Sequence, residues 1–215
     1  MKLSKRLETI ANLIDKNDMV ADVGCDHAYL SIYLAKNKLC KKIIATEVVE
    51  GPYNIASINI KNAGFEDNIK LYLTDGLINV SEELNTIVVA GMGANTIIKI
   101  LKNYSNLNEV NKLIIQSNND WELIRKYLNS VGFYIKKEFY VCEKNKDYIT
   151  MLAYRNNKKN TEIELAVGVY NSEIKSFYQK QIDKLNSILV KIENHEDDNY
   201  KRIEKKLKYL KKYIN

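Results

Sequence analysis

Acidic side chains or glycines follow four short apolar runs of the sequence. The first such place is residues 21–30, ADVGCDHAYL, in which Asp22 and Asp26 stand on either side of Gly24. The others are Glu47, the pair Asp75-Gly76, and the loop Gly91-Met92-Gly93. Carboxylates attract cations and accept hydrogen bonds, and a glycine lets a ligand approach the backbone closely. We therefore expect a binding site for a ligand that carries positive charge.

The apolar runs have the length of β-strands and are rich in Val, Ile and Leu, at residues 19–24, 42–48, 69–74, 85–92 and 111–117. Segments with helical periodicity separate them, at about 29–37, 52–64, 94–103 and 119–131. Apolar strands that alternate with helices are typical of a parallel sheet covered on both faces. The carboxyl ends of parallel strands meet at one edge of such a sheet, where ligands bind. The four acidic or glycine-containing places should therefore lie close together.

The pattern changes after Gly132. Residues 132–155 contain two strand-like runs joined by a Lys/Asn turn, with no helix between them. This pattern predicts an antiparallel hairpin added to the parallel sheet. We therefore predict an α/β fold, a doubly wound Rossmann-like sheet with a C-terminal antiparallel strand pair, an arrangement that resembles class I methyltransferases more than dehydrogenases.

Two heptad seams follow at the C-terminus, Tyr178, Ile182, Leu185, Leu189 and Ile192, and then Ile203, Leu207, Leu210 and Ile214. Residues 194–199, NHEDDN, separate them with turn-forming side chains. This arrangement predicts an α-helical coiled-coil hairpin, docked on the sheet or projecting from it, and gives two domains, residues 1–160 and 161–215. Self-association is an alternative use of the seam, although we expect a monomer.

Composition narrows the class of protein. The chain has 215 residues and a net charge of +6, and no apolar run approaches the ~20 residues of a membrane span. The three cysteines lack metal-ligand spacing, so we expect reduced thiols in a cytoplasmic protein without a metal site. The basic clusters at residues 154–160 and 201–215 could hold phosphates or form a solvated face.

Asp26 helps to identify the ligand class, because it stands where a helix N-terminus would otherwise bind a phosphate. A dinucleotide pyrophosphate would be repelled there. S-adenosylmethionine has no phosphate and carries an ammonium and a sulfonium. In that case Glu47 can accept the ribose hydroxyls, Asp75 can accept the adenine amine, and Gly24 allows close approach. Taken singly, each acid could instead be a helix cap.

Several blocks of the sequence resemble the bacterial tRNA (adenine(22)-N1)-methyltransferase family. They are LSKRLETIANLI, ADVGCDHAYLSIYL, EVVEGPYNIASINI, TDGL, IVVAGMG and IIQSNND, and the likeness extends into the C-terminal seams. The resemblance implies a class I methyltransferase that uses S-adenosyl-L-methionine to methylate N1 of adenine 22 in tRNA. One departure is Ser117, where a Gln-Pro-Asn signature would place proline between Gln116 and Asn118.

The resemblance also implies roles for individual residues. The cofactor-binding set is Asp22, Gly24, Cys25, Glu47, Asp75, Gly76 and Gly91, and the reaction-site set is Asp26, His27, Tyr29, Gly91, Met92 and Gly93. We expect Asn118 and the basic residues Lys201, Arg202, Lys205 and Lys206 to contact tRNA. Asp26 is the first candidate to stabilise the cationic product ring, and orienting the cofactor ammonium is its alternative role.

Other functions stay open at this point. A methyltransferase could act on another RNA base or a small molecule, and a non-catalytic tRNA-binding protein could keep the fold. The loop Gly91-Met92-Gly93 lacks the Asn/Asp-Pro-Pro-aromatic motif of enzymes that methylate exocyclic amines, which favours a ring nitrogen as acceptor. A nicotinamide-dependent oxidoreductase is disfavoured because Gly-x-Gly-x-x-Gly is absent.

Overall fold

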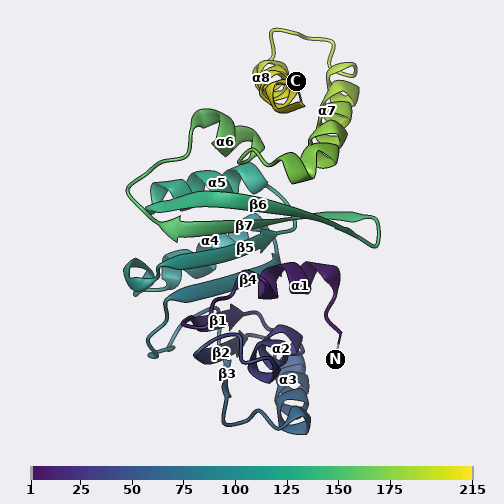
Figure 1. Cartoon of the computed structure of the whole chain (residues 1–215). Coiled ribbons are helices and arrows are strands. Elements are labelled where there is room, and N and C mark those ends of the chain that lie inside the picture. The colour runs from purple at the N-terminus through teal and green to yellow at the C-terminus, as the bar shows by residue number, and fades with distance from the viewer. Residues whose placement is uncertain (1, 215) are drawn as a thin grey trace.

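The protein is described by a computed structural model that covers residues 2–214. Its centre is a seven-stranded sheet of order β3-β2-β1-β4-β5-β7-β6 (Figure 1). The strands are β1 (Met19–Val23), β2 (Lys42–Glu47), β3 (Ile69–Leu73), β4 (Thr86–Met92), β5 (Lys112–Ser117), β6 (Phe133–Glu143) and β7 (Lys146–Arg155). The first five are parallel, and β7 pairs antiparallel with both β5 and β6. This topology confirms the predicted fold class.

Helices cover both faces of the sheet. They are α1 (Lys5–Ala11), α2 (Tyr29–Lys36), α3 (Glu50–Ala63), α4 (Ala94–Asn103), α5 (Trp121–Ser130), α6 (Glu162–Val167), α7 (Lys175–Leu189) and α8 (Asp198–Ile214), with short 3-10 turns at Leu107–Glu109 and Ser172–Ile174. One apolar core joins α1, α2 and α3 to the sheet, and the other joins α4, α5, α7 and α8 to its opposite face. Successive β4 residues alternate between the two cores, as a strand buried on both faces requires.

The turn between β6 and β7 has a regular geometry. Lys144 and Asn145 both have positive φ, 50° and 60°, which is the geometry of a type I′ turn between antiparallel strands.

A buried ion pair joins α5 to β6. Arg125 of α5 donates two hydrogen bonds to Glu138 of β6, at 2.7 and 3.0 Å. Because removal of either partner would leave a buried charge, this ion pair fixes how α5 and β6 pack.

The C-terminal helices α7 and α8 pack against each other, as the heptad seams predict (Figure 1). They dock rather than project, because Tyr178, Ile182, Leu207 and Leu210 belong to the same apolar core as β4 and β5. Ile192 lies beyond the end of α7. The boundary at residue 160 and the monomeric state stay predictions.

Candidate functional site

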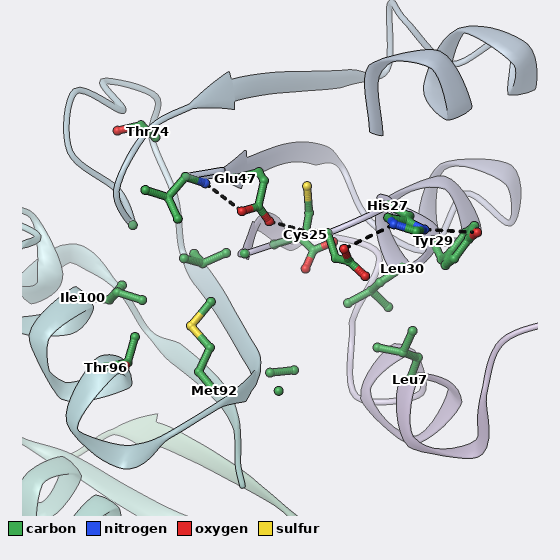
Figure 2. A pocket seen from close by; sticks show the side chains of 18 of the residues that line it. Leu7, Cys25, His27, Tyr29, Leu30, Glu47, Thr74, Met92, Thr96 and Ile100 are labelled. Carbon is green, nitrogen blue, oxygen red and sulfur yellow. Dashed lines mark hydrogen bonds and ion pairs between the residues drawn. The ribbon is translucent and has the colours of Figure 1, made fainter. Parts of the chain in front are cut away.

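The carboxyl ends of β1, β2 and β4, together with the loop after β3, surround a cavity of about 350 Å³ (Figure 2). The sequence-predicted residues that line it are Asp22, Gly24, Cys25, Asp26, His27, Tyr29, Glu47, Asp75, Gly76, Gly91 and Met92. Gly93, Asn118 and the four basic residues of α8 do not line it. The structure thus brings together nearly all of the predicted cofactor and reaction-site residues.

The loop from β1 to α2 is held in an uncommon backbone conformation. Gly24, Asp26 and Ala28 all have positive φ, at 70°, 51° and 58°. The backbone N–H groups of Gly24 and Cys25 donate to the Thr46 carbonyl at 2.8 and 2.9 Å, which ties the loop to β2. Left-handed backbone at non-glycine residues is costly and gathers at ligand-binding sites. The loop therefore has a fixed shape before any ligand binds.

Glu47 organises the backbone at the end of β2. Its Oε1 accepts hydrogen bonds from the N–H groups of Val48 and Val49 at 2.9 and 3.0 Å, and its Oε2 accepts from Asp26 N–H at 3.0 Å. A carboxylate offers about four acceptor sites, so three are taken and one remains on Oε2. Oε2 therefore keeps an acceptor site for a ligand hydroxyl, and the acceptance of both ribose hydroxyls by Glu47 stays a prediction.

Asp22 and Cys25 are the buried ionisable groups of the β1 end of the cavity, in contrast to the exposed Asp26. Asp22 is buried, and its Oδ2 accepts a hydrogen bond from Ser31 Oγ at 2.7 Å. Burial raises the pKa of Asp22 to about 6, although the Ser31 hydrogen bonds oppose this shift. Burial also raises the pKa of the Cys25 thiol, so Cys25 is a neutral wall of the cavity and not a nucleophile.

Asp75 is paired with a cation that the sequence analysis did not single out. Its Oδ2 lies 2.9 Å from Nζ of Lys99 on α4, and both side chains are partly exposed. The neighbouring Gly76 has φ +65°, and a Cβ added there would lie 3.1 Å from Ile100 Cγ2. A larger residue at Gly76 would therefore push against α4 and distort this wall.

Asp26, His27 and Tyr29 line the cavity and form a chain of polar contacts, and Figure 2 shows His27 beside Tyr29. Asp26 Oδ1 lies 3.5 Å from His27 Nε2, and His27 Nδ1 lies 3.4 Å from the Tyr29 hydroxyl. The two rings meet edge to face, with centroids 5.5 Å apart. The Asp26 side chain is 70% exposed, so its carboxylate is free to meet a substrate.

Met92 lies directly over the glycine loop (Figure 2). A Cβ added at Gly24 would lie 2.0 Å from Cε of Met92, so a side chain at Gly24 would displace the methionine. Gly91 also has positive φ, at 81°, whereas Gly93 is the N-cap of α4 beside Asn119. Gly24 and Met92 therefore line the cavity side by side.

Arg6 of α1 lines the cavity and was missed by the sequence analysis. Its Nη1 donates to Gln116 Oε1 at 2.9 Å, Gln116 Nε2 donates to Asn118 Oδ1 at 3.3 Å, and Asn118 Nδ2 donates to the Gly91 carbonyl at 2.7 Å. The signal available was the LSKRLETIANLI block, but nothing in its spacing shows that α1 reaches the strand ends. Asn118 thus supports the Gly91 loop from the other side of the cavity wall.

Two basic residues of α8 line a second cavity, of about 670 Å³, between α5, α7 and α8. Arg202, Lys206 and Asn118 line it. Lys206 pairs with Glu122, Lys205 pairs with Glu162, and Lys201 pairs with Glu196. The Lys201 and Lys205 pairs are exposed and therefore weak, so these two lysines can exchange a carboxylate for a phosphate, whereas the Lys206–Glu122 pair is partly buried.

Residues 2–214 contain no group of three or more potential metal ligands, and Cys25, Cys40 and Cys142 are free thiols. No helix in this range is long and apolar enough to cross a membrane. What the cavity offers is a set of carboxylates, one guanidinium and a glycine floor. This donor set suits a zwitterionic ligand with an additional positive charge, and so fits S-adenosylmethionine.

Comparison with known proteins agrees with this geometry. Residues 3–151 match the family described as a methyltransferase domain. The solved structure of M. capricolum TrmK, in complex with the cofactor product S-adenosyl-homocysteine, is 31% identical, has a TM-score of 0.85, and covers 100% of this chain and 98% of its own. The chain belongs to the tRNA (adenine(22)-N1)-methyltransferase family.

Two comparisons, one of sequence and one of structure, show the similarity of this chain to the Bacillus subtilis tRNA methyltransferase of this family. The B. subtilis (strain 168) enzyme of that name is 34% identical over 155 residues, a match that spans 71% of this chain and 65% of the enzyme. The crystal structure of the B. subtilis m1A22 tRNA methyltransferase TrmK is 26% identical, with a TM-score of 0.84, and covers 100% of this chain and 99% of its own. The structural similarity therefore includes the C-terminal helices.

Proposed function

We propose that this protein transfers a methyl group from S-adenosylmethionine to N1 of the adenine at position 22 of tRNA. The observation that carries the proposal is the match over the whole chain, with α7 and α8 included, to M. capricolum TrmK with S-adenosyl-homocysteine and to the B. subtilis m1A22 tRNA methyltransferase TrmK. The acidic cavity at the carboxyl ends of the strands supports the same conclusion, because its charge suits a sulfonium cofactor.

The acceptor nitrogen needs no deprotonation before it attacks, so the site must mainly align the reactants and stabilise the cationic product. Bound S-adenosylmethionine supplies a methyl group that is activated by its sulfonium sulfur. Adenine N1 has an in-plane lone pair, so alignment with the methyl group can provide much of the rate enhancement. The product ring is cationic, and the exposed carboxylate of Asp26 is placed to stabilise that charge. Tyr29, which is 44% exposed, offers an aromatic edge for the base.

The target adenine must leave the tRNA stack to reach this cavity, at a cost of a few kcal/mol. Contacts with the tRNA backbone can offset that cost. Arg202 and Lys206 line the second cavity, and Asn118 connects its wall to the Gly91 loop by the 2.7 Å hydrogen bond. We infer that tRNA lies along α8 and this second cavity while the adenine occupies the first.

The direct test is methyl transfer from labelled S-adenosylmethionine to unmodified tRNA, with the product nucleoside identified by mass spectrometry. A tRNA with guanine at position 22 is the matched control. Label in 1-methyladenosine that disappears with the control tRNA supports the proposal. Label that persists with the control would indicate another acceptor, and tight cofactor binding without any transfer would indicate a non-catalytic tRNA-binding protein.

Cofactor binding should depend on pH through Asp22. Because the pKa of Asp22 is raised to about 6, the carboxylate that attracts the cofactor ammonium is lost as the pH falls through about 6. The dissociation constant for S-adenosylmethionine should therefore be constant above pH 7 and rise by up to about tenfold per pH unit below pH 6. In Ser31→Ala the rise should begin at a higher pH, since the Ser31 hydrogen bonds lower this pKa.

Calorimetry between pH 5 and pH 8 would measure this dependence. Asp22→Asn is the control, because it removes the titrating group and should bind weakly at every pH. A pH profile that is the same in the native protein and in Asp22→Asn would show that another group controls the binding.

Neutralising the basic residues of α8 should weaken tRNA binding. In a variant with Lys201, Arg202, Lys205 and Lys206 changed to Gln, we expect weaker binding to all tRNAs. The plot of log K against log salt should become shallower by roughly 0.7 to 0.9 for each phosphate contact that is lost. Cofactor affinity should not change, because these side chains lie outside the first cavity.

The matched control changes an equal number of exposed lysines at the amino ends of β1 and β2, away from both cavities: Lys16, Lys36, Lys38 and Lys41 to Gln. Filter binding at several salt concentrations would compare the two variants. Equal salt slopes in both would mean that α8 is a packing element and not a tRNA contact.

A further inference from the structure

Among residues 2–214, Arg6 is the one Lys or Arg side chain that lines the first cavity. It extends from α1, whose N-terminus is capped by Ser4, so the guanidinium belongs to a helix and not to a free tail. A Cβ added at Gly91 would lie 3.6 Å from Arg6 Nη1, which places the guanidinium beside the end of β4. Arg6 therefore brings a positive charge to a cavity whose other charged walls are acidic.

The guanidinium is held in place but keeps most of its hydrogen-bonding capacity. Its Nη1 donates to Gln116, which is fully buried, and its central carbon lies 5.5 Å from the centre of the Tyr148 ring. None of the ion pairs within residues 2–214 includes Arg6. A guanidinium has five N–H donors in a planar fork that matches a carboxylate. Arg6 is thus oriented for an anionic group that the protein itself does not supply.

The arrangement of charges in the cavity identifies that anion. Asp22 and Asp26 lie on the β1 side, and Arg6 lies beside the end of β4. The methionine portion of the proposed cofactor carries an ammonium and a carboxylate on the same carbon atom, so both charges must find partners in one small volume. Asp22 matches the ammonium, because Asp26 is assigned to the product base in the proposed reaction, and within residues 2–214 the cavity has one guanidinium to match the carboxylate.

We propose that Arg6 binds the carboxylate of the methionine portion of S-adenosylmethionine, and thereby selects the intact cofactor over analogues that lack this group. The inference rests on the proposed function, since it assigns a residue to the cofactor of that reaction. It gives α1 a functional role in addition to covering the sheet, because α1 carries the side chain that completes the charge match. It also accounts for the LSKRLETIANLI block, to which the sequence analysis gave no role.

The test compares two ligands that differ by the carboxylate alone, S-adenosylmethionine and decarboxylated S-adenosylmethionine, by titration calorimetry without tRNA. The native protein should bind the decarboxylated compound roughly 10- to 100-fold more weakly, the loss expected for a charge-assisted hydrogen bond pair. Arg6→Met should lose the same factor for S-adenosylmethionine and lose almost nothing further for the decarboxylated compound. Arg6→Lys should keep part of the preference, since it retains the charge without the planar fork.

Lys5→Met is the matched control, because Lys5 is the neighbouring cation on α1 and lies outside the cavity. Thermal unfolding without ligand checks that each variant is folded. If Arg6→Met weakens both ligands equally, Arg6 acts only through Gln116 on the Gly91 loop and the inference is wrong. If it leaves both affinities unchanged but raises KM for tRNA, Arg6 binds a phosphate of the substrate instead. Failure of the native protein to bind S-adenosylmethionine at all would overturn the proposed function itself.

Discussion

Glu47→Gln is expected to weaken S-adenosylmethionine binding by roughly 100-fold or more. The native carboxylate accepts three backbone hydrogen bonds, from the N–H groups of Asp26, Val48 and Val49. A glutamine side chain has one acceptor oxygen, and its NH2 group would face a backbone N–H that also needs an acceptor. The substitution therefore disturbs the β1–α2 loop and the end of β2 together, in addition to losing a hydroxyl acceptor for the cofactor.

Calorimetry with S-adenosylhomocysteine measures this effect without any contribution from the transfer step. Glu50→Gln is the control, because Glu50 is an exposed acid on the first turn of α3, three residues further along. The control should bind as the native protein does. If Glu47→Gln retained native affinity while remaining folded, Glu47 would only hold the backbone between β2 and α3 and would not be part of the cofactor site.

Asp26→Asn should lower kcat by about 100-fold or more while changing cofactor affinity by less than about threefold. The side chain is exposed, and its carboxylate makes no hydrogen bond to the backbone of the loop, whereas the backbone N–H of residue 26 keeps its bond to Glu47. Asparagine tolerates the left-handed conformation found here, at φ 51°, so the loop should keep its shape. The change removes the negative charge that we expect to stabilise the methylated, cationic base.

Single-turnover kinetics with saturating tRNA would separate this chemical effect from binding. Asp67→Asn, an exposed acid in the turn between α3 and β3, provides a change of equal charge away from the cavity. Should Asp26→Asn raise the dissociation constant for the cofactor and leave kcat unchanged, Asp26 would orient the ammonium and another group would stabilise the product.

His27 and Tyr29 lie next to Asp26 and are candidates for recognition of the target base. The chain of contacts from Asp26 through His27 to the Tyr29 hydroxyl links the expected charge-stabilising group to an exposed aromatic side chain. Both rings line the cavity that a base that has left the tRNA stack would enter (Figure 2). Their roles in base recognition stay predictions that the same kinetic assay can test.

The strand ends illustrate what sequence reasoning can reach. Asp22, Glu47, Asp75 and Gly91 are far apart in the chain, yet they line one cavity. Their meeting was predictable because apolar runs and helices alternate, and parallel strands in such a fold place their carboxyl ends at one edge. Local sequence also specified the left-handed turn at Lys144 and Asn145 and the packing seam of α7 and α8.

Pairings between distant side chains were not predictable in this way. Lys99 pairs with Asp75 because α4 packs beside the loop after β3, and Lys206 pairs with Glu122 because α8 docks against α5. The heptad seam predicted that α7 and α8 would meet each other, but it did not specify what else they would contact. In the fold, Phe177 of α7 contacts Trp121 of α5 and Tyr140 of β6, and α8 contacts α6.

The sequence by itself determined the class of fold, the edge of the sheet that carries the site, and the charge of its ligand, because strand periodicity and acidic strand ends are local properties. Only the tertiary structure shows that Glu47 accepts three hydrogen bonds from backbone N–H groups. It alone also places Met92 over Gly24 and brings Arg6 to the cavity. These features depend on where α1 and the loops pack, and packing is set by the whole apolar core and not by any one segment.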